Sequence, residues 1–438
     1  MKAFVRQYIF HLKRWTYSDW LWRLAILSLP WQTRLFFEGP SLAGYPWEQG
    51  RISVYASMCL MLTYSLFVVF KKHKRSLIKL RPEMFIGFLL LLVVSLLTMN
   101  TRATFMWILQ VIVIVVFFMS LARDYLVRKD TLITWFCLSM IPHALLGIAQ
   151  FLDQRVIAST FLGIAEQLPK TLGVSVIETG GERVLRAYGG FPHPNIFGGW
   201  LAFSTAGALF CGLKKKGVSF YTWMIGVMLF TTALFLSFSR SAWLAAIWLV
   251  GIIAGGLFFK GGNAELKHRV VQAISAMVIC TALLGIWQSP LLTTRTHIGA
   301  RLEAKSFEER GFAMQLAEKT IAKHWLVGTG EGAYLYALVT THIWDASYPG
   351  PPIPPHNAFV LLFAELGALG TAGLLLLGIG IMKQITKRRD WMHGRSLIFF
   401  VPIGLLGIFD YYLWSFWSGQ ILCAIVIMGW ALTLDKHE

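Results

Sequence analysis

The chain has 438 residues, of which 56% are hydrophobic and 14% charged, and its formal net charge is +18. Apolar runs of about 18 or more residues recur along nearly its whole length, which the core of a soluble protein does not require. The composition therefore excludes an ordinary soluble protein and predicts an all-α polytopic membrane protein. Most of the excess Lys and Arg lies in short loops between apolar runs, where these residues set topology, so we expect no nucleic-acid partner.

The apolar runs predict about twelve transmembrane helices in a single membrane domain, residues 1–438. No internal repeat is evident, and the P-loop pattern GxxxxGK[ST] is absent, so any energy must come from the substrate or a gradient. The five cysteines lie inside apolar runs without metal-ligand spacing, which is typical of small buried side chains. The predicted spans are 17–33, 52–70, 83–99, 103–121, 131–151, 194–212, 219–237, 241–259, 270–288, 357–382, 396–410 and 412–433.

The distribution of basic residues predicts the orientation of the chain. Lys and Arg gather in alternate short loops, such as 71–81, 214–216 and 383–395, whereas charges in the other loops are balanced. The positive-inside rule then puts both termini and the basic loops in the cytoplasm. The two long loops, 152–193 and 289–356, are expected on the outside.

The second long loop contains a predicted helix that carries Arg310. Ser306 and Glu309 fit a capping box, and the helix is expected to run to about Trp325. Arg310 falls within its apolar stripe, so it requires an anionic partner or water. It is either a snorkelling or salt-bridged arginine, or an anion clamp for a phosphate. The stripe consists of Ala313, Met314, Ala317, Ile321 and Trp325.

Three further segments carry candidate residues: two at the outer ends of spans, and one after the helix of the second long loop. Arg186 and His193 precede the span at 194, where Pro194-Asn195 suits a helix entry; Arg186 is expected to face inward, and His193 is either a turn residue or part of a site. Arg240 lies in a very short outer connection, as an interfacial residue or a third cation facing the same cavity. The glycines of 328–332 either end a helix or approach a phosphate closely.

His356-Asn357 stands where the second long loop re-enters an apolar helix. A group that titrates near neutrality is costly there, which makes His356 a functional candidate. Glu365, further along this helix, is as consistent with a structural hydrogen bond as with catalysis. Arginines and histidines thus gather outside without a carboxylate cluster for Mg²⁺ or Mn²⁺, which predicts a lipid-linked pyrophosphate handled without metal or other cofactor.

These segments resemble the O-antigen ligase and polymerase superfamily. The resemblance rests on residues 186–199 (RAYGGFPHPNIFGG), on residues 237–242 (SFSRSA), and on a block from Glu309-Arg310 to Gly370-Thr371 that includes His356-Asn357. The family pattern often has Leu four residues after the loop arginine, where this chain has Met314. By motif the resemblance covers about residues 180–375.

The resemblance implies a metal-independent membrane glycosyltransferase with a GT-C-like fold in the bacterial inner membrane, its active site on the periplasmic face. The implied donor is a glycan on undecaprenyl diphosphate. The acceptor is lipid A–core oligosaccharide in a ligase, or a growing glycan in a polymerase; other members glycosylate proteins. His356 would activate the acceptor hydroxyl, and Arg186 and Arg310, with Arg240, His193 and Asn357, would bind the diphosphate or substrate.

The sequence motifs do not separate a ligase from a polymerase, because the two differ in acceptor and share the donor chemistry. We favour the ligase, with the polymerase as the alternative. A transporter fits twelve spans, but paired inverted repeats and broken helices in corresponding halves are not evident. The sugar, the oligomeric state and the role of His193 are not specified by the sequence.

Overall fold

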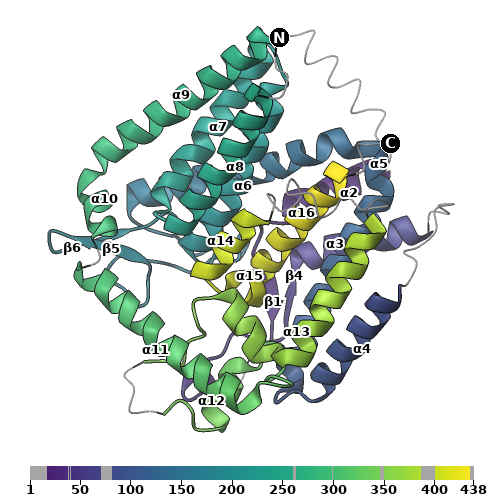
Figure 1. Ribbon diagram of the computed structural model, residues 1–438. Helices are drawn as coiled ribbons and strands as arrows, with labels where there is room; N and C mark the ends of the chain where they lie inside the picture. Colours follow the sequence, from purple (N-terminus) through teal and green to yellow (C-terminus); the bar gives the residue numbers. More distant parts are fainter. Residues whose placement is uncertain are drawn as a thin grey trace.

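The protein is a polytopic helical membrane protein, as predicted (Figure 1). The computed structural model describes residues 17–70 apart from Glu38 and Pro40, and residues 81–259, 263–297, 299–345, 350–385 and 400–434. In these ranges helices dominate, and the strands form three two-stranded antiparallel sheets. Seven helical segments of the described chain are long and apolar enough to cross a membrane. The total of twelve spans and the GT-C architecture stay predictions.

Full-length candidate spans occupy the middle of the chain. Residues in these helices are almost continuously apolar, so the helices bury side chains against one another and against lipid. Five of them agree with predicted spans to within a few residues, apart from an earlier start of the fourth. They are α6 (Pro194–Leu213), α7 (Val218–Leu236), α8 (Arg240–Phe259), α9 (Ala264–Trp287) and α13 (Ala358–Ile385).

Two more candidate spans share one helix, α5 (Thr101–Asp153), where a loop was expected between 121 and 131. The prediction of that break was wrong. The intervening sequence ARDYLVRKD contains neither Gly nor Pro, so nothing in it interrupts the helical hydrogen bonds. Basic residues mark a change of topology, but they do not by themselves end a helix.

Shorter helices occupy the remaining predicted spans. The described parts of α2 and α14 have 12 and 9 residues, fewer than the roughly 20 that a crossing needs. The spans predicted at 17–33 and 396–410 are therefore not full-length helices within the described chain. These shorter helices are α2 (Tyr17–Ser28), α3 (Ala56–Phe70), α4 (Pro82–Leu96), α14 (Val401–Phe409), α15 (Tyr412–Ser415) and α16 (Trp417–Leu434).

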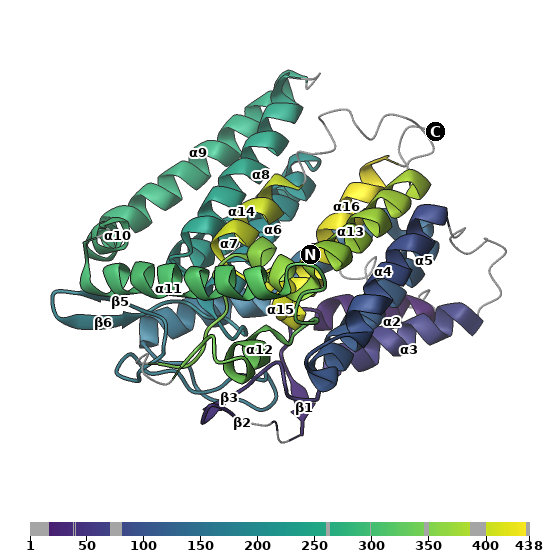
Figure 2. The ribbon, with the colours of Figure 1, turned by 60° about the horizontal axis from the view of Figure 1, so that its bottom comes forward.

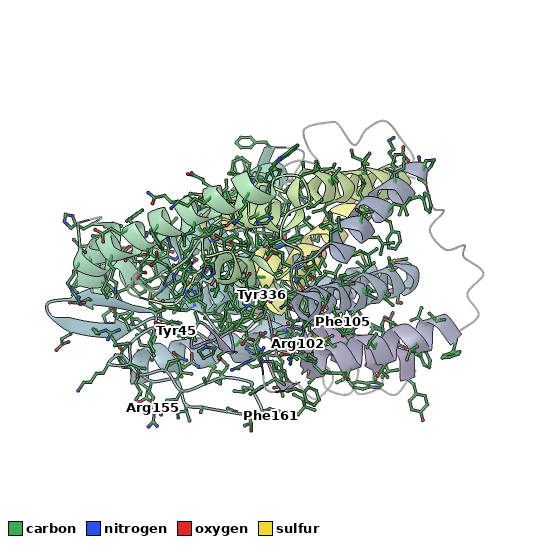
Figure 3. The ribbon with its side chains drawn as sticks, turned by 90° about the horizontal axis from the view of Figure 1, so that it is seen from below. Tyr45, Arg102, Phe105, Arg155, Phe161 and Tyr336 are labelled. Atoms are coloured by element: carbon green, nitrogen blue, oxygen red, sulfur yellow. The ribbon has the colours of Figure 1, made fainter. Side chains whose placement is uncertain are left out.

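Strands, which were not predicted, connect α2 to α3. We call residues 34–55 the N-terminal hairpin: its outer strands β1 (Arg34–Phe36) and β4 (Ser53–Tyr55) pair with each other, as do its inner strands. Trp47 stacks on Tyr336 with ring centroids 5.8 Å apart. Figure 3 views the molecule from this side and labels Tyr45, Arg102 and Tyr336. The inner strands are β2 (Ser41–Leu42) and β3 (Tyr45–Pro46), and Tyr336 belongs to α12 (Tyr334–Thr340).

The two long loops are also folded. The first forms the hairpin β5 (Val176–Thr179) and β6 (Glu182–Leu185). The second contains α10 (Ser289–Thr296), α11 (Arg301–His324) and α12. Figure 2 shows α11 running across the outside of the other helices, from α10 towards α12.

The predicted capping box at Ser306 was wrong, because the N-cap of α11 is Ala300, six residues earlier. Two side chains of its first turn hold the early start: Arg301 pairs with Glu178 of β5, and Glu303 is buried in an ion-pair cluster. Tertiary contacts thus extend the helix beyond its local signal.

The loop that follows α11 fills a break in α13. At Gly367 the backbone of α13 leaves helical geometry, with φ 60° and ψ −169°. The amides of Thr329 and Gly330 donate to the carbonyls of Ala364 and Glu365 there. The glycine-rich segment 328–332 therefore ends a helix and packs against another, and these two amides are occupied. The turn interpretation is confirmed.

Both termini and the basic segments 71–80 and 386–399 lie outside the described residues. The predicted orientation of the chain depends on them, so it stays a prediction.

Candidate active site

Arg186 is buried where the first long loop meets the membrane helices. It is 4% exposed, and three of its five N–H groups donate hydrogen bonds: to the carbonyl of Ser237 (2.8 Å), to Ser175 Oγ (2.8 Å) and to Asn195 Oδ1 (2.7 Å). Burial lowers the pKa of Arg186, and the nearby charge of Arg295 acts in the same direction. The predicted inward placement is confirmed, and two donors are left for a ligand.

Asn195 connects Arg186 to a carboxylate distant in the sequence. Its Nδ2 donates to Asp410 Oδ2 at 2.8 Å. Asn195 lies in the first turn of α6, directly after Pro194. Its backbone amide donates to Nδ1 of His193 at 3.1 Å. The predicted helix entry is confirmed, with His193 as the capping residue. Burial lowers the pKa of His193, and Arg186 lowers it further, so the ring stays neutral and able to accept.

His356 faces the same carboxylate. Its Nδ1 lies 3.8 Å from Asp410 Oδ1, beyond hydrogen-bond distance, and its side chain is 29% exposed. The ring meets Tyr411 edge to face, with centroids 5.3 Å apart. Burial lowers the pKa of His356, whereas Asp410 raises it. A neutral, partly open imidazole beside a carboxylate has the features of a general base.

Arg310 completes this cluster from α11. Ala313 and Ala317, three and seven residues on, are fully buried, so Arg310 lies on the packed face as predicted. Its guanidinium makes no hydrogen bond or ion pair with any residue that the structure describes. Burial lowers the pKa of Arg310, and the charge of Asp410 opposes this effect. A half-buried cation without a protein partner is costly unless a ligand anion occupies the space before it.

Arg240 belongs to an adjacent ion-pair cluster. Its guanidinium donates to Glu303 Oε2 at 3.0 Å and to the carbonyl of Arg295 at 3.1 Å. Arg295 pairs with the other oxygen of Glu303 and donates to the carbonyl of Phe238. One buried carboxylate thus faces two guanidinium groups. The positive charge of Arg240 also acts on Arg310, so both clusters contribute to one electropositive region.

Asn357 and Glu365 have structural roles in the described chain. Asn357 Oδ1 accepts from the amides of Phe359 (3.0 Å) and Val360 (3.1 Å), and so caps α13. Glu365 is 3% exposed and accepts from the amides of Gly332 and Tyr334 and from the indole of Trp414. Glu365 therefore joins α13 to the neighbouring loop and to α15.

Sequence reasoning missed three charged residues of the site: Asp410, Arg295 and Glu303. A signal for Asp410 existed, since an acidic residue between two apolar runs marks a functional candidate. Arg295 and Glu303 carried no comparable signal, because charges in a long outer loop are ordinary. The structure brings Arg186, His193, Arg310 and His356 around Asp410, places Arg240 beside them, and uses Asn357 as a helix cap.

The arrangement of these residues agrees with a comparison to known families. Residues 225–375 match the O-Antigen ligase family model. The predicted resemblance to the O-antigen ligase superfamily is confirmed, and the match indicates a function of the O-antigen ligase or polymerase type. The matched segment includes Arg240, Arg310 and His356, whereas Arg186 and Asp410 lie outside it. No curated protein matches the chain.

Proposed function

We propose that the protein is an O-antigen ligase-type glycosyltransferase of the bacterial inner membrane. It moves a glycan from undecaprenyl diphosphate to a hydroxyl of lipid A–core oligosaccharide on the periplasmic face. The observation that carries the proposal is the guanidinium of Arg310, which has no described protein partner and acts electrostatically on both His356 and Asp410. A base and a free cation in one place suit a displacement that expels a diphosphate.

The diphosphate would bind between Arg310 and Arg186. Arginine matches phosphate geometry with paired N–H donors, and its charge is not lost at neutral pH. Arg186 has two donors left, and all those of Arg310 are without a described partner. Arg240, which is ion-paired with Glu303, would add positive charge beside the diphosphate. As the leaving group gains negative charge, these fixed cations stabilise it.

His356 would act as the base in a single displacement. The acceptor oxygen bonds to the anomeric carbon of the donor sugar while the bond from that carbon to the phosphate oxygen breaks. The electron pair of the broken bond leaves with undecaprenyl diphosphate, and the acceptor proton passes to His356. Because Nδ1 faces Asp410, Nε2 is the nitrogen that takes the proton, and Asp410 stabilises the imidazolium. Attack opposite the leaving group inverts the anomeric centre.

The polyprenyl chain of the donor would use a cavity next to the first long loop. This cavity, about 930 Å³, lies between the β5–β6 hairpin and the ends of α9 and α10. Phe151, Trp287 and Leu291 supply apolar surface there, and Arg183 and Lys170 supply charge. Apolar walls beside a membrane interface suit an isoprenoid tail.

A transfer assay tests the proposal. Purified full-length protein is incubated with undecaprenyl-diphosphate-linked glycan and lipid A–core in the presence of EDTA. Glycan on lipid A–core supports the ligase. Growth of the lipid-linked chain instead would indicate a polymerase, and transfer that EDTA abolishes would contradict the metal-independent mechanism.

A further inference from the structure

A small polar cavity lies away from His356, between the N-terminal hairpin, the start of α5 and the junction of α15 with α16. Its volume is about 40 Å³. One water needs roughly 10–15 Å³ by the same measure, so the cavity admits a small group such as a carboxylate or a phosphate, and excludes a whole sugar ring.

The polar groups of this cavity suit an anion. Arg34 is hydrogen-bonded to Glu48, to Ser53 Oγ (3.4 Å) and to Tyr55 OH (3.2 Å). A terminal nitrogen of Arg51 lies 3.9 Å from the other oxygen of Glu48, too far for a hydrogen bond. The buried Nε of Arg51 has no hydrogen-bond partner among the described residues. Two guanidinium groups thus face one nearby glutamate, and the second keeps donors for a ligand.

Glu365 also lines the cavity, but its carboxylate is occupied. Its oxygens accept from the amides of Gly332 and Tyr334 and from the indole of Trp414. Gln110 and Phe416 contribute an amide and an aromatic ring to the lining. Arg51 is therefore the charged side chain best placed to meet an anionic group.

One face of α15 connects this cavity to His356. Tyr411, Ser415 and Phe416 are partly exposed, whereas Tyr412, Leu413, Trp414 and Trp417 are buried. Residues four apart share a helix face, so Tyr411 and Ser415 lie on one open side. The ring of Tyr411 contacts both His356 and Phe416, with centroids 5.3 and 6.1 Å apart. A short oligosaccharide on this face would reach from the cavity to the base.

We infer that this cavity binds an anionic substituent, a carboxylate or phosphate, on a sugar of the acceptor oligosaccharide. The inference rests on the proposed function, because it names how the acceptor of that reaction is recognised. The bound substituent fixes one sugar of the acceptor, and the chain of sugars then lies along α15 with a hydroxyl at His356. The N-terminal hairpin thereby helps to determine which acceptor is used. Its arginines lie outside the segment that matches the family model.

Direct binding tests the inference without any transfer step. The ligand is delipidated lipid A–core oligosaccharide, either intact or dephosphorylated and carboxyl-reduced, titrated calorimetrically into full-length protein. The intact form should bind at least tenfold more tightly. Arg51→Gln should remove that preference, and so should Gln110→Glu, which places a negative charge at the cavity without disturbing the hairpin. Equal binding of both forms to the unaltered protein, or a preference that survives both substitutions, would overturn the inference.

Matched controls and competitors identify the source of the anion. Arg155→Gln removes an exposed, ion-paired arginine of the first long loop and should leave the preference intact. Inorganic phosphate and vesicles containing anionic phospholipid should displace the oligosaccharide only weakly; strong displacement by the vesicles would assign the cavity to a lipid headgroup.

KM measurements for acceptor and donor distinguish this inference from the proposed function. Arg51→Gln should raise the KM for the acceptor at least tenfold and leave the KM for the donor unchanged. If acceptor binding follows the prediction but no glycan is transferred, the proposed function fails alone. If transfer proceeds and the acceptor KM is unaffected, this inference fails alone.

Discussion

Asp410 Oδ1 lies 3.8 Å from Nδ1 of His356, while its other oxygen accepts a hydrogen bond from Asn195 at 2.8 Å. Asn195 in turn accepts from Arg186 at 2.7 Å. Oδ1 itself accepts from the backbone amide of Tyr411 at 2.8 Å, so both oxygens of the carboxylate are fixed. A small rotation of the imidazole would then bring Nδ1 to hydrogen-bond distance of Oδ1. Catalytic hydrogen bonds are often long before substrate binds.

The pH dependence of kcat/KM tests the role of Asp410. Burial lowers the pKa of His356, so the base is neutral at pH 7 and activity should fall only as the pH drops below about 6.5. Asp410 raises this pKa. Asp410→Asn should therefore shift the acid limb to lower pH, and also reduce the rate at neutral pH because the imidazolium loses its counter-charge. A limb that stays in place or moves upward would contradict this role.

Replacement of Arg310 tests the diphosphate clamp. Arg310→Gln should lower kcat/KM by roughly 10²–10³-fold, the usual effect of removing one donor that stabilises developing charge. Lys305→Gln is the matched control: it removes an exposed, ion-paired cation from the same helix and should change the rate little. Equal effects of the two substitutions on kcat/KM would indicate that any change in α11 disturbs its structure. That result would contradict a specific role for Arg310.

Gly367 supports the break in α13. Its φ of 60° with ψ of −169° is accessible almost only to glycine, and an added Cβ would lie 2.5 Å from the amide nitrogen of Gly328. Gly367→Ala should therefore lower the melting temperature and the yield in detergent. Gly378→Ala, in the same helix with open space around it, should be neutral or slightly stabilising. The comparison fails if both variants melt alike.

Glu365 should contribute to stability. Glu365→Ala leaves two amides and one indole without their acceptor in a buried setting, at a cost of roughly 1–3 kcal/mol for each donor that remains unsatisfied. Thermal unfolding should show the loss. Glu166→Ala, which breaks only the exposed pair with Arg155, should be close to the unaltered protein. An unchanged melting temperature for Glu365→Ala would count against the structural role.

Much of the membrane core could be predicted from the sequence, because apolar runs of about 20 residues have few alternatives to a transmembrane helix. The break predicted in α5 was wrong because basic residues do not end a helix, and the start of α11 was predicted wrongly because tertiary contacts overrode a local signal. Glu303, held between Arg240 and Arg295, extends α11 past the apparent cap at Ser306. The N-terminal hairpin was missed because its strands have two or three residues each and depend on packing against α12.

The residues of the candidate site also fall into those that the sequence could predict and those that it could not. Arg186 and His356 could be chosen from their positions at the outer ends of apolar runs, and Arg310 from its place in the apolar stripe of a loop helix. Asp410 could not be assigned to them, because its proximity to His356 and Asn195 arises only when α6, α13 and α14 pack together. Asn357 was grouped with the substrate-binding residues, yet its side chain caps α13. Its position just before a long apolar helix is also typical of a capping residue.

The most direct test of the proposed mechanism is the rate of glycan transfer by His356→Ala, measured with purified protein, lipid-linked donor and lipid A–core in EDTA. The variant should insert with normal yield, bind both substrates, and transfer roughly 10²–10⁴-fold more slowly, the usual contribution of a general base. Transfer at the unaltered rate would remove His356 from the mechanism and contradict the central claim.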